Sequence, residues 1–372
     1  MSTSRISAVV LTAAAALGLA ACGSSSSTTP SSSSTGSTAK IAPATIDGAG
    51  STLAAPIYMQ WASNVKSQGL TVNYSAVGSG TGVADLESGT VDFAGSDPPL
   101  ASADLTAIDK KGKPAQFPMA FGAITVSYNL PGVQTGLKLN GKVIGDIFDG
   151  AVTKWNSPEI ATLNPGVKLP STTITVVHRS DSSGTTDGFT EFLAATNPTF
   201  AKKIGSGKLV PWPSGETGAA KNAGVAAAVK QTAGAVGYVE QAYALENSFT
   251  YAAVENSSGK FILPTIANTS AAAVGLKVPT DLGLVAINSS NPAAYPIVSQ
   301  TFIDVYKDMC KAGVSSSAAK GVYDFLNYAF TTGESELGPG SNQLPYAPLP
   351  ASLLAKDKAQ LATLTCNGAP LS

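Results

Sequence analysis

The sequence predicts an α/β protein built from two domains. The chain has 372 residues, more than one hydrophobic core comfortably supports, and 44% of them are hydrophobic. Runs with strand composition alternate with runs of helical spacing, which is typical of α/β layers with largely parallel sheets. No long polar linker divides residues 41–372. We therefore expect the chain to cross between the domains more than once, in short extended segments.

The expected elements can be placed by composition and spacing. Strands are expected where β-branched and aromatic residues gather, at Leu70–Val77, Val91–Ala94, Ala123–Asn129 and Ile174–His178. Helices are expected where apolar residues recur at helical spacing or composition favours a helix, at Pro56–Ala62, Thr81–Glu87, Phe189–Ala195 and Ala219–Thr232.

Charge and composition exclude several functions. Only 13% of residues are charged and the formal net charge is −1, so the chain offers no broad basic surface for nucleic acid. A single histidine excludes a His-rich metal site. We find no P-loop, no strand-linked G-x-G-x-x-G with an acidic partner and no G-x-S-x-G, so neither a nucleotide nor another cofactor is expected. Any bound anion must be captured locally, by a few aimed groups.

The N-terminus predicts export and a lipid anchor. Arg5 precedes the apolar run Ile6–Leu19, which is too short for a typical membrane span and fits the core of an export signal. Leu19–Gly23 (LAACG) resembles a bacterial lipobox, in which cleavage before the cysteine exposes a residue that is diacylated. The resemblance implies a signal peptide over residues 1–21 and a lipoprotein held on the extracytoplasmic face of the cell membrane through Cys22. An ordinary secreted chain is the alternative.

Residues 22–40 are expected to form a flexible tether. From Gly23 to Ala39 the sequence has no charge and no large apolar side chain, so it cannot bury enough surface to offset its chain entropy. We expect the folded part to begin near Lys40.

The two remaining cysteines predict a structural disulfide. Cys310 and Cys366 are 56 residues apart, a spacing that fits neither a zinc site nor a redox CxxC pair. Disulfides persist in the compartment of an exported protein. Two separate buried thiols are the alternative.

Three turns of small residues, at 48–52, 78–82 and 182–186, each precede an expected helix. Such a turn aims free backbone N–H groups, the positive end of a helix and hydroxyl donors at one spot, while its glycines let an oxyanion approach the main chain. One such turn is usually an ordinary capped loop. Three in one chain predict convergence on a single anion.

Two charged residues sharpen this prediction. Arg179 supplies a planar fork that grips two oxyanion oxygens, and Asp181 could hold that fork in orientation or be a surface carboxylate. Asp97 could be a turn residue before proline, and a carboxylate should repel an anion. The repulsion becomes recognition if the anion still carries a proton that Asp97 can accept, and an anion without a proton is then rejected.

Taken in order, these segments resemble those of the PstS family, the periplasmic phosphate-binding proteins of the high-affinity phosphate ABC importer. The resemblance runs from about residue 46 to the Tyr295–Met309 region and, more loosely, to the C-terminus. The matching segments are GAGSTLAAPIYMQWAS (48–63), VGSGTG (77–82), TVDFAGSDPPL (90–100), IGDIFDGAVTKWNSPEIATLNPGVKLPS (144–171), VVHRSDSSGTT (176–186) and GAVGYVEQAYA (234–244).

The resemblance implies a two-domain fold of the periplasmic-binding-protein type II class, with the ligand cleft between the domains. The first domain would take residues 41–119 and 299–372, and the second residues 120–298. Family phosphate contacts carry over onto Thr52, Leu53, Ser79, Asp97, Arg179, Ser183, Gly184 and Thr185. Leu53 stands where many members have phenylalanine, but that contact is made by a main-chain N–H. Asp97 would accept the proton of the phosphate.

The function implied is that of a receptor, not an enzyme, which binds phosphate, closes its domains and delivers the anion to the permease of an ABC importer. A receptor for sulfate, molybdate or a phosphonate is an alternative of the same class. A secreted phosphoester hydrolase would use Ser183 as nucleophile and His178 as base, but strand alternation should turn His178 away from Arg179. An adhesive surface protein would account for the lipobox but not for the clustered donors.

Overall fold

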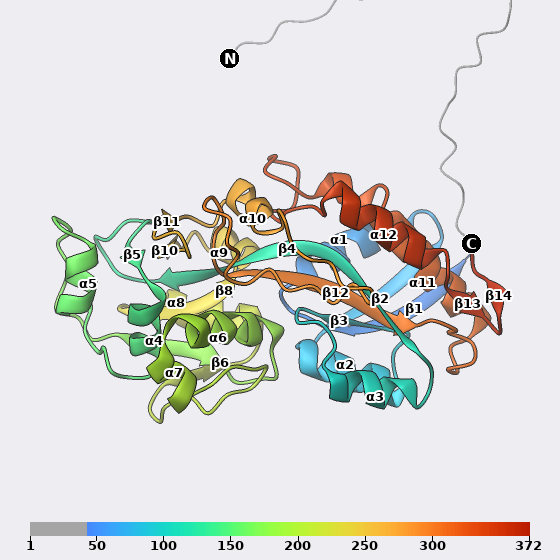
Figure 1. Ribbon diagram of the computed structural model, residues 1–372, viewed down its shortest axis with the longest axis horizontal. Coiled ribbons are helices and arrows are strands. Elements are labelled where there is room, and N and C mark those ends of the chain that lie inside the picture. Colours follow the sequence, from blue (N-terminus) through green and yellow to red (C-terminus); the bar gives the residue numbers. More distant parts are fainter. Residues whose placement is uncertain (1–42) are drawn as a thin grey trace, which may run out of the picture. The chain divides into compact units, whose positions relative to one another are not determined.

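The computed structural model describes residues 43–372 (Figure 1). The expected signal peptide, Cys22 and the tether lie outside the described residues. The described part is built on a nine-stranded sheet in the order β2-β1-β3-β12-β4-β8-β6-β7, with β9 paired to β4 beside this path. The bounds are β1 (Ala44–Gly50), β2 (Leu70–Ala76), β3 (Phe93–Ser96), β4 (Pro114–Tyr128), β6 (Thr175–Arg179), β7 (Thr217–Ala219), β8 (Ala235–Glu240), β9 (Thr250–Tyr251) and β12 (Val298–Tyr306).

The strands run parallel in the outer parts of this sheet and antiparallel at its centre. β1 pairs in parallel with β2 and β3, and β6 pairs in parallel with β7 and β8. At the centre, β12 is antiparallel to β3 and β4, and β4 is antiparallel to β8. The prediction of largely parallel sheets is therefore wrong at the centre. There the chain passes out along β4 and back along β12, and the return direction of β12 makes the pairing antiparallel.

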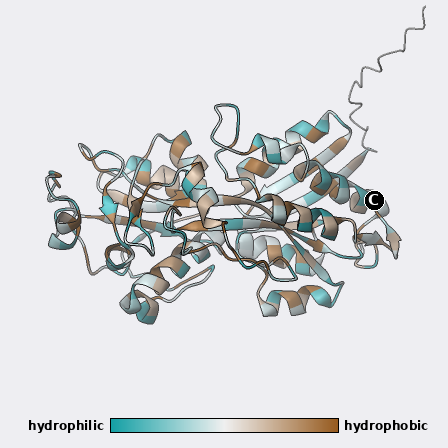
Figure 2. Cartoon of the chain, turned by 45° about the horizontal axis from the view of Figure 1, so that its top comes forward, coloured by the Kyte–Doolittle hydropathy of each residue, from teal (hydrophilic) through white to brown (hydrophobic). Residues whose placement is uncertain are grey.

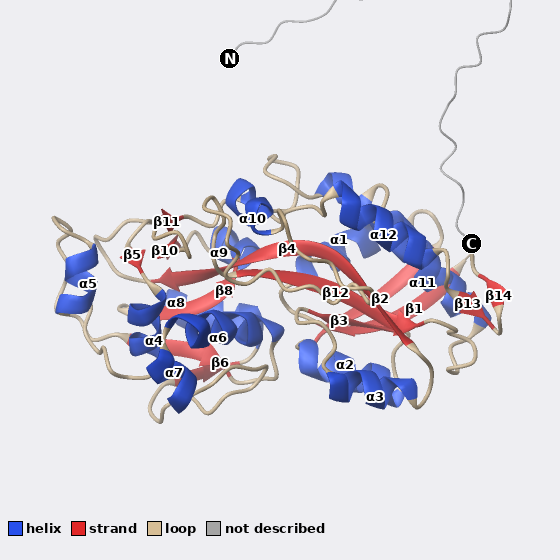
Figure 3. Cartoon of the chain, viewed as in Figure 1, coloured by secondary structure: helices blue, strands red, loops and turns tan. Residues whose placement is uncertain are grey.

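Strand β4 joins the two parts of the sheet (Figure 3). Its first part, Pro114–Ala123, pairs with β12, and its second part, Ile124–Tyr128, pairs with β8. Apart from Pro114 the strand is buried throughout. The sequence predicted only its second half because Pro118 interrupts the first, and a proline is tolerated within a sheet mainly at edges and bulges. The register does shift here, since Phe302 pairs with Pro118 and Thr301 with Ala120.

Helices cover the sheet, and the four predicted helices are present. They are α1 (Ala55–Lys66), α2 (Ser79–Ser88), α6 (Gly184–Thr196) and α8 (Lys221–Gln231). The other helices are α3 (Ser102–Asp109), α4 (Gly141–Phe148), α5 (Pro158–Leu163), α7 (Pro198–Lys203), α9 (Gln241–Glu246), α10 (Ile266–Ala272), α11 (Ser316–Ala329) and α12 (Ala351–Leu361), with a 3-10 helix η1 (Gly333–Glu336). Helix α6 begins earlier than expected, so its first turn consists of the small residues predicted as a loop.

A three-stranded sheet in the order β11-β10-β5, a strand pair β13-β14 and a disulfide complete the fold. The short strands are β5 (Lys138–Leu139), β10 (Ala253–Glu255), β11 (Phe261–Ile262), β13 (Thr365–Cys366) and β14 (Ala369–Pro370). Cys310 and Cys366 form a disulfide with their Cα atoms 4.7 Å apart, which ties the segment after β12 to β13.

The core fills the space between the sheet and its helices. Two aromatic groups mark it: Trp61, Phe93 and Phe325 on one part of the sheet, and Phe148, Phe189 and Tyr238 on the other. Hydrophobic positions run along the strands, and hydrophilic ones are interspersed on the covering helices (Figure 2). Within residues 43–372, no helix is both long enough and apolar enough to traverse a bilayer.

Candidate functional site

The predicted site residues lie together in one buried place, which we call the cradle. It comprises Thr52, Leu53, Ser79, Asp97, Arg179, Ser183, Gly184 and Thr185, all of them buried. They lie at or just after the ends of strands β1, β3 and β6 and at the starts of helices α2 and α6. The turn after β1 requires glycine at position 50. Gly50 has a φ of 140°, and a Cβ there would lie 2.0 Å from the carbonyl oxygen of Gly95.

The first turn of the cradle, residues 51–54, is held by hydrogen bonds to Asp97 and to Tyr243. Ser51 Oγ accepts a hydrogen bond from the Ala54 main-chain N–H at 3.0 Å and donates to Asp97 Oδ1. The Tyr243 hydroxyl donates to the carbonyl oxygen of Thr52 at 2.8 Å. The orientation of residues 51–54 therefore depends on contacts with segments far away in the sequence.

Asp97 is the acceptor group of the cradle. Thr301 Oγ1 donates to Asp97 Oδ1 at 3.1 Å, beside Ser51, and Ser79 Oγ donates to Oδ2 at 3.2 Å. Burial raises the pKa of Asp97 to about 6, although the three hydroxyls and the charge of Arg179 act in the opposite direction. Asp97 is thus ionised at neutral pH, and Oδ2 retains capacity to accept a further hydrogen bond.

Arg179 is the cation of the cradle, and its side chain is only 1% exposed. Its Nε and Nη2 atoms donate to the carboxylate of Asp181, with Nε 2.7 Å from Oδ1. Burial raises the pKa of Asp181, but the hydrogen bonds and charge of Arg179 hold that pKa below its ordinary value. Asp181 grips one edge of the guanidinium, while Nη1 lies 3.5 Å from Thr185 Oγ1 inside the cradle.

The start of α6 brings the third turn against the other two. Ser183 caps the helix, accepting from the main-chain N–H of Thr186 at 3.1 Å. A Cβ on Gly184 would lie 2.5 Å from both Asp97 Oδ2 and Ser79 Oγ, so only glycine allows this approach. The first N–H groups of any helix have no partner within the helix, and α6 directs its own at this spot.

Three residues that contact the cradle were not predicted from the sequence. Asn222, fully buried at the start of α8, donates from Nδ2 to Thr52 Oγ1 at 2.9 Å and to Thr185 Oγ1 at 3.1 Å. Thr301 reaches Asp97 from β12, and Tyr243 reaches Thr52 from α9. The only local signal was a polar residue where an apolar one would be ordinary, as at the start of α8 and within the apolar strand β12.

The side chain of His178 is engaged outside the cradle. The His178 ring stacks on Trp212 with the ring centroids 5.1 Å apart, and its Nδ1 lies 2.9 Å from the carbonyl oxygen of Arg179. Partial burial lowers the pKa of His178. Its side chain is half-buried, whereas that of Arg179 enters the cradle, as strand alternation predicted. Within residues 43–372, no group of three potential metal ligands is close enough to hold a metal ion.

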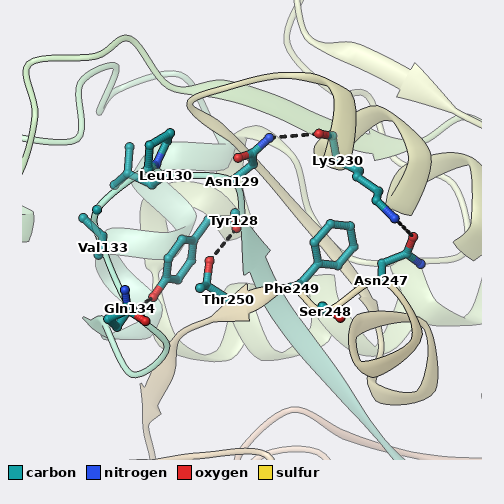
Figure 4. A pocket seen from close by; sticks show the side chains of 12 residues that line it. Tyr128, Asn129, Leu130, Val133, Gln134, Lys230, Asn247, Ser248, Phe249 and Thr250 are labelled. Carbon is teal, nitrogen blue, oxygen red and sulfur yellow. Dashed lines mark hydrogen bonds between the residues drawn. The ribbon is translucent and has the colours of Figure 1, made fainter.

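A separate pocket of about 320 Å³ lies at the end of β4 and contains no residue of the cradle (Figure 4). Lys230 is the only charged residue that lines it, and its Nζ lies 3.4 Å from Asn247 Oδ1. Thr250 Oγ1 donates to the Tyr128 carbonyl oxygen at 2.7 Å. Its cation and the Thr250 hydroxyl are thus already hydrogen-bonded within the protein.

Comparison with known proteins assigns the family. The PBP superfamily domain matches residues 26–332. The phosphate-binding protein PstS of Xylella fastidiosa (strain 9a5c) is 37% identical over 322 residues, covering 86% of this chain and 85% of its own length. That of Pasteurella multocida (strain Pm70) is 38% identical over 323 residues, covering 86% of this chain and 90% of its own. The chain belongs to the PstS family.

Solved structures confirm the predicted fold class for this PstS-family chain. A high-affinity periplasmic phosphate-binding protein bound with phosphate (PfluDING) superposes with a TM-score of 0.68 at 23% identity, covering 84% of this chain and 93% of its own. The phosphate-binding protein of Stenotrophomonas maltophilia superposes with a TM-score of 0.64 at 21% identity, covering 87% and 96%. The α/β fold is thus that of the periplasmic binding proteins.

Proposed function

We propose that this protein is an extracytoplasmic receptor that captures inorganic phosphate in the cradle and delivers it to the permease of an ABC importer. The observation that carries the proposal is the presence of a buried cation, Arg179, and a buried carboxylate, Asp97, in the same cradle. A cation and hydroxyl donors suit an oxyanion, and an ionised carboxylate among them suits an oxyanion that still carries a proton. Phosphate at neutral pH is such an anion, and the proposal includes no catalytic step.

Each cradle residue has a role in this proposal. Arg179 grips two phosphate oxygens with the guanidinium edge that Asp181 leaves free, and Asp97 accepts the proton of the anion. The remaining contacts are donors: the hydroxyls of Thr52, Ser79, Ser183 and Thr185 and the main-chain N–H groups of Leu53 and Gly184. The names of the relatives, phosphate-binding protein PstS, support phosphate as the anion.

The proposal also includes closure of two domains, residues 41–119 with 299–372 and residues 120–298. Contacts between these two sets of residues surround the cradle. Asn222 bonds Thr52, and the Gly80 N–H donates to the Ser182 carbonyl oxygen at 3.3 Å. At the margin, Lys208 Nζ lies 3.1 Å from Asp104 Oδ2. An anion that bonds donors of both domains favours the closed state, because only that state satisfies all of them.

The titration that tests the proposal compares phosphate, arsenate and sulfate. Phosphate and arsenate are expected to bind tightly, and sulfate at least about a hundredfold more weakly, because sulfate has no proton to donate to Asp97. Isothermal titration calorimetry of the full chain at neutral pH measures all three affinities. Sulfate binding as tight as phosphate would favour a receptor for another oxyanion, and no binding of any anion would overturn the proposal.

We further propose that residues 1–21 are a signal peptide and that lipidation of Cys22 holds the protein at the membrane, with residues 22–40 as a tether. Two acyl chains on one residue anchor firmly, whereas one holds only marginally. Replacing Cys22 by alanine is therefore expected to move the protein from the membrane fraction to the soluble fraction, as measured by fractionation and immunoblotting. An unchanged distribution would contradict the anchor.

A further inference from the structure

Glu240 is a fully buried acid at the end of β8, directly behind the first turn of the cradle. Its Oε2 atom accepts the main-chain N–H of Ala242 at 2.6 Å and lies 2.9 Å from the hydroxyl of Tyr346. The crossing strand β4 passes the same place, since a Cβ on Gly122 would lie 3.1 Å from Leu53, 3.4 Å from Glu240 and 3.5 Å from Tyr346. Glu240 thus lies beside Tyr346, behind Leu53, at the point where β4 passes between the two parts of the sheet.

The hydrogen bonds around Tyr346 require one more proton than the tyrosine supplies. Its hydroxyl lies 2.7 Å from the carbonyl oxygen of Leu53 and 2.9 Å from Glu240 Oε2. The single hydroxyl proton can serve only one of the two contacts, and a carbonyl oxygen can only accept, so for both contacts to be hydrogen bonds that proton must go to Leu53. The contact with Glu240 is then a hydrogen bond only if the carboxyl group carries a proton and donates it to the tyrosine oxygen.

The surroundings of Glu240 favour the neutral carboxyl group. Within residues 43–372 Glu240 belongs to no ion pair, and its Oε1 atom has no hydrogen-bond partner. The titratable groups that face it are Tyr346, Tyr243 and Asp97, none of them a cation. Burial raises the pKa of Glu240 well above its ordinary value, and the charge of Asp97 adds a smaller increase, although hydrogen bonds with the main-chain N–H groups of Ala242 and Gln241 and with Tyr346 act in the opposite direction.

Glu240 is linked to residues 52 and 53 indirectly, through three residues that it contacts or positions. Its main-chain N–H donates to Asn222 Oδ1 at 3.0 Å, and Asn222 bonds Thr52. Its side chain caps α9, the helix that carries Tyr243, whose hydroxyl bonds the Thr52 carbonyl oxygen. Through Tyr346 it supports the Leu53 carbonyl oxygen. The residues whose main-chain and hydroxyl groups face the anion are therefore held from behind by one acid.

We propose that Glu240 is kept as a neutral carboxylic acid that donates its proton to Tyr346, and that it is a positioning residue which fixes residues 51–54 for the anion. Its role toward the anion rests on the proposed function. Its protonation state and its hold on the turn do not, so they can be measured without any ligand.

The protonation state is measured by carbon NMR of the full chain labelled at the glutamate carboxyl carbon. The Glu240 resonance is identified by its loss in Glu240→Gln or, should that variant fail to fold, by its displacement in Tyr346→Phe. We expect this resonance to keep the position of a protonated carboxyl from about pH 6 to about pH 8, above the ordinary pKa of glutamate. A resonance at the carboxylate position over that range would overturn the neutral state.

The positioning role is measured with Tyr346→Phe, and Tyr295→Phe is the matched control. Tyr295 is also fully buried and donates to a main-chain carbonyl oxygen, that of Ile124 at 2.9 Å, but it does not contact residues 51–54. Tyr346→Phe is expected to speed amide hydrogen exchange at residues 53 and 54 and to weaken phosphate binding about tenfold. Tyr295→Phe is expected to do neither.

Equal effects of the two variants, or none from Tyr346→Phe, would overturn the positioning role. If the wild-type chain bound no phosphate, the proposed function would fall, but hydrogen exchange and NMR would still confirm or overturn the role of Glu240. The two proposals can therefore fail separately.

Discussion

Replacing Arg179 by methionine is expected to weaken phosphate binding by about a thousandfold or more, because it removes a desolvated charge with its aligned donors from a site that excludes water. Arg179 is the only arginine beyond Arg5, and its side chain is 1% exposed. Arg179→Lys is expected to recover only part of the affinity, since an ammonium group keeps the charge but loses the planar fork. Calorimetric titration of phosphate into each variant measures the loss.

Two controls separate binding from folding in this experiment. The methionine variant leaves Asp181 without its partner, so the double variant Arg179→Met with Asp181→Asn tests whether an unpaired acid causes the loss. Lys230→Met removes a cation from the separate pocket at the end of β4 and is expected to keep full affinity. Phosphate binding by Arg179→Met within about threefold of the wild type would contradict the role given to the guanidinium.

Replacing Asp97 by asparagine is expected to reduce the preference for phosphate over sulfate by about a hundredfold. Phosphate loses the acceptor for its proton, while sulfate no longer meets a negative charge in a buried site. Asparagine keeps the size of the side chain, and its oxygen can still accept the hydroxyls of Ser51 and Thr301. Competition titrations of both anions against both proteins measure the ratio of the two affinities, and an unchanged ratio would show that Asp97 does not discriminate between the anions.

The pH dependence gives an independent test of the same carboxyl group. Burial raises the pKa of Asp97 to about 6, so the group is ionised above that pH and protonated below it. The repulsion of sulfate is therefore present at high pH and is lost as the pH falls through about 6. Sulfate affinity of the wild type should rise across this range, whereas that of Asp97→Asn should stay flat. A wild type with the flat profile of the variant would contradict this assignment.

The place of the cradle could be predicted because the signals of its turns and charges are local, whereas the family resemblance supplied the individual contact residues. The three turns have the glycines and hydroxyls of an anion-binding helix start, and Arg179 and Asp97 are conspicuous in a chain with few charges. Asn222 and Thr301 carry no such signal, because their roles arise from tertiary contact. Asn222 reaches Thr52 across 170 residues of sequence, and Thr301 reaches Asp97 across 204. Local sequence patterns contain no information about contacts between residues so far apart in the chain.

The class of the fold could likewise be predicted from the sequence, but the pairing of its central strands could not. Alternating strands and helices correctly indicated the α/β class, since that pattern is a property of neighbouring residues. The length of β4 and the antiparallel centre were missed, because they depend on where the chain returns. Pro118 looks like the end of a strand until β12 lies beside it with a shifted register.

The position of β12 in the sheet affects when the protein can fold during its synthesis. In the sheet it lies between β3 and β4, two strands that are synthesised long before it. A nascent chain can therefore complete the sheet around Asp97 only after β12 has left the ribosome, and the same strand brings Thr301 to that carboxylate. The segment with Arg179 and both of its sheet partners, β7 and β8, are synthesised before β12. Any product of interrupted translation that ends before β12 lacks Thr301 and the strand between β3 and β4, so only a chain that extends through β12 can present the complete cradle.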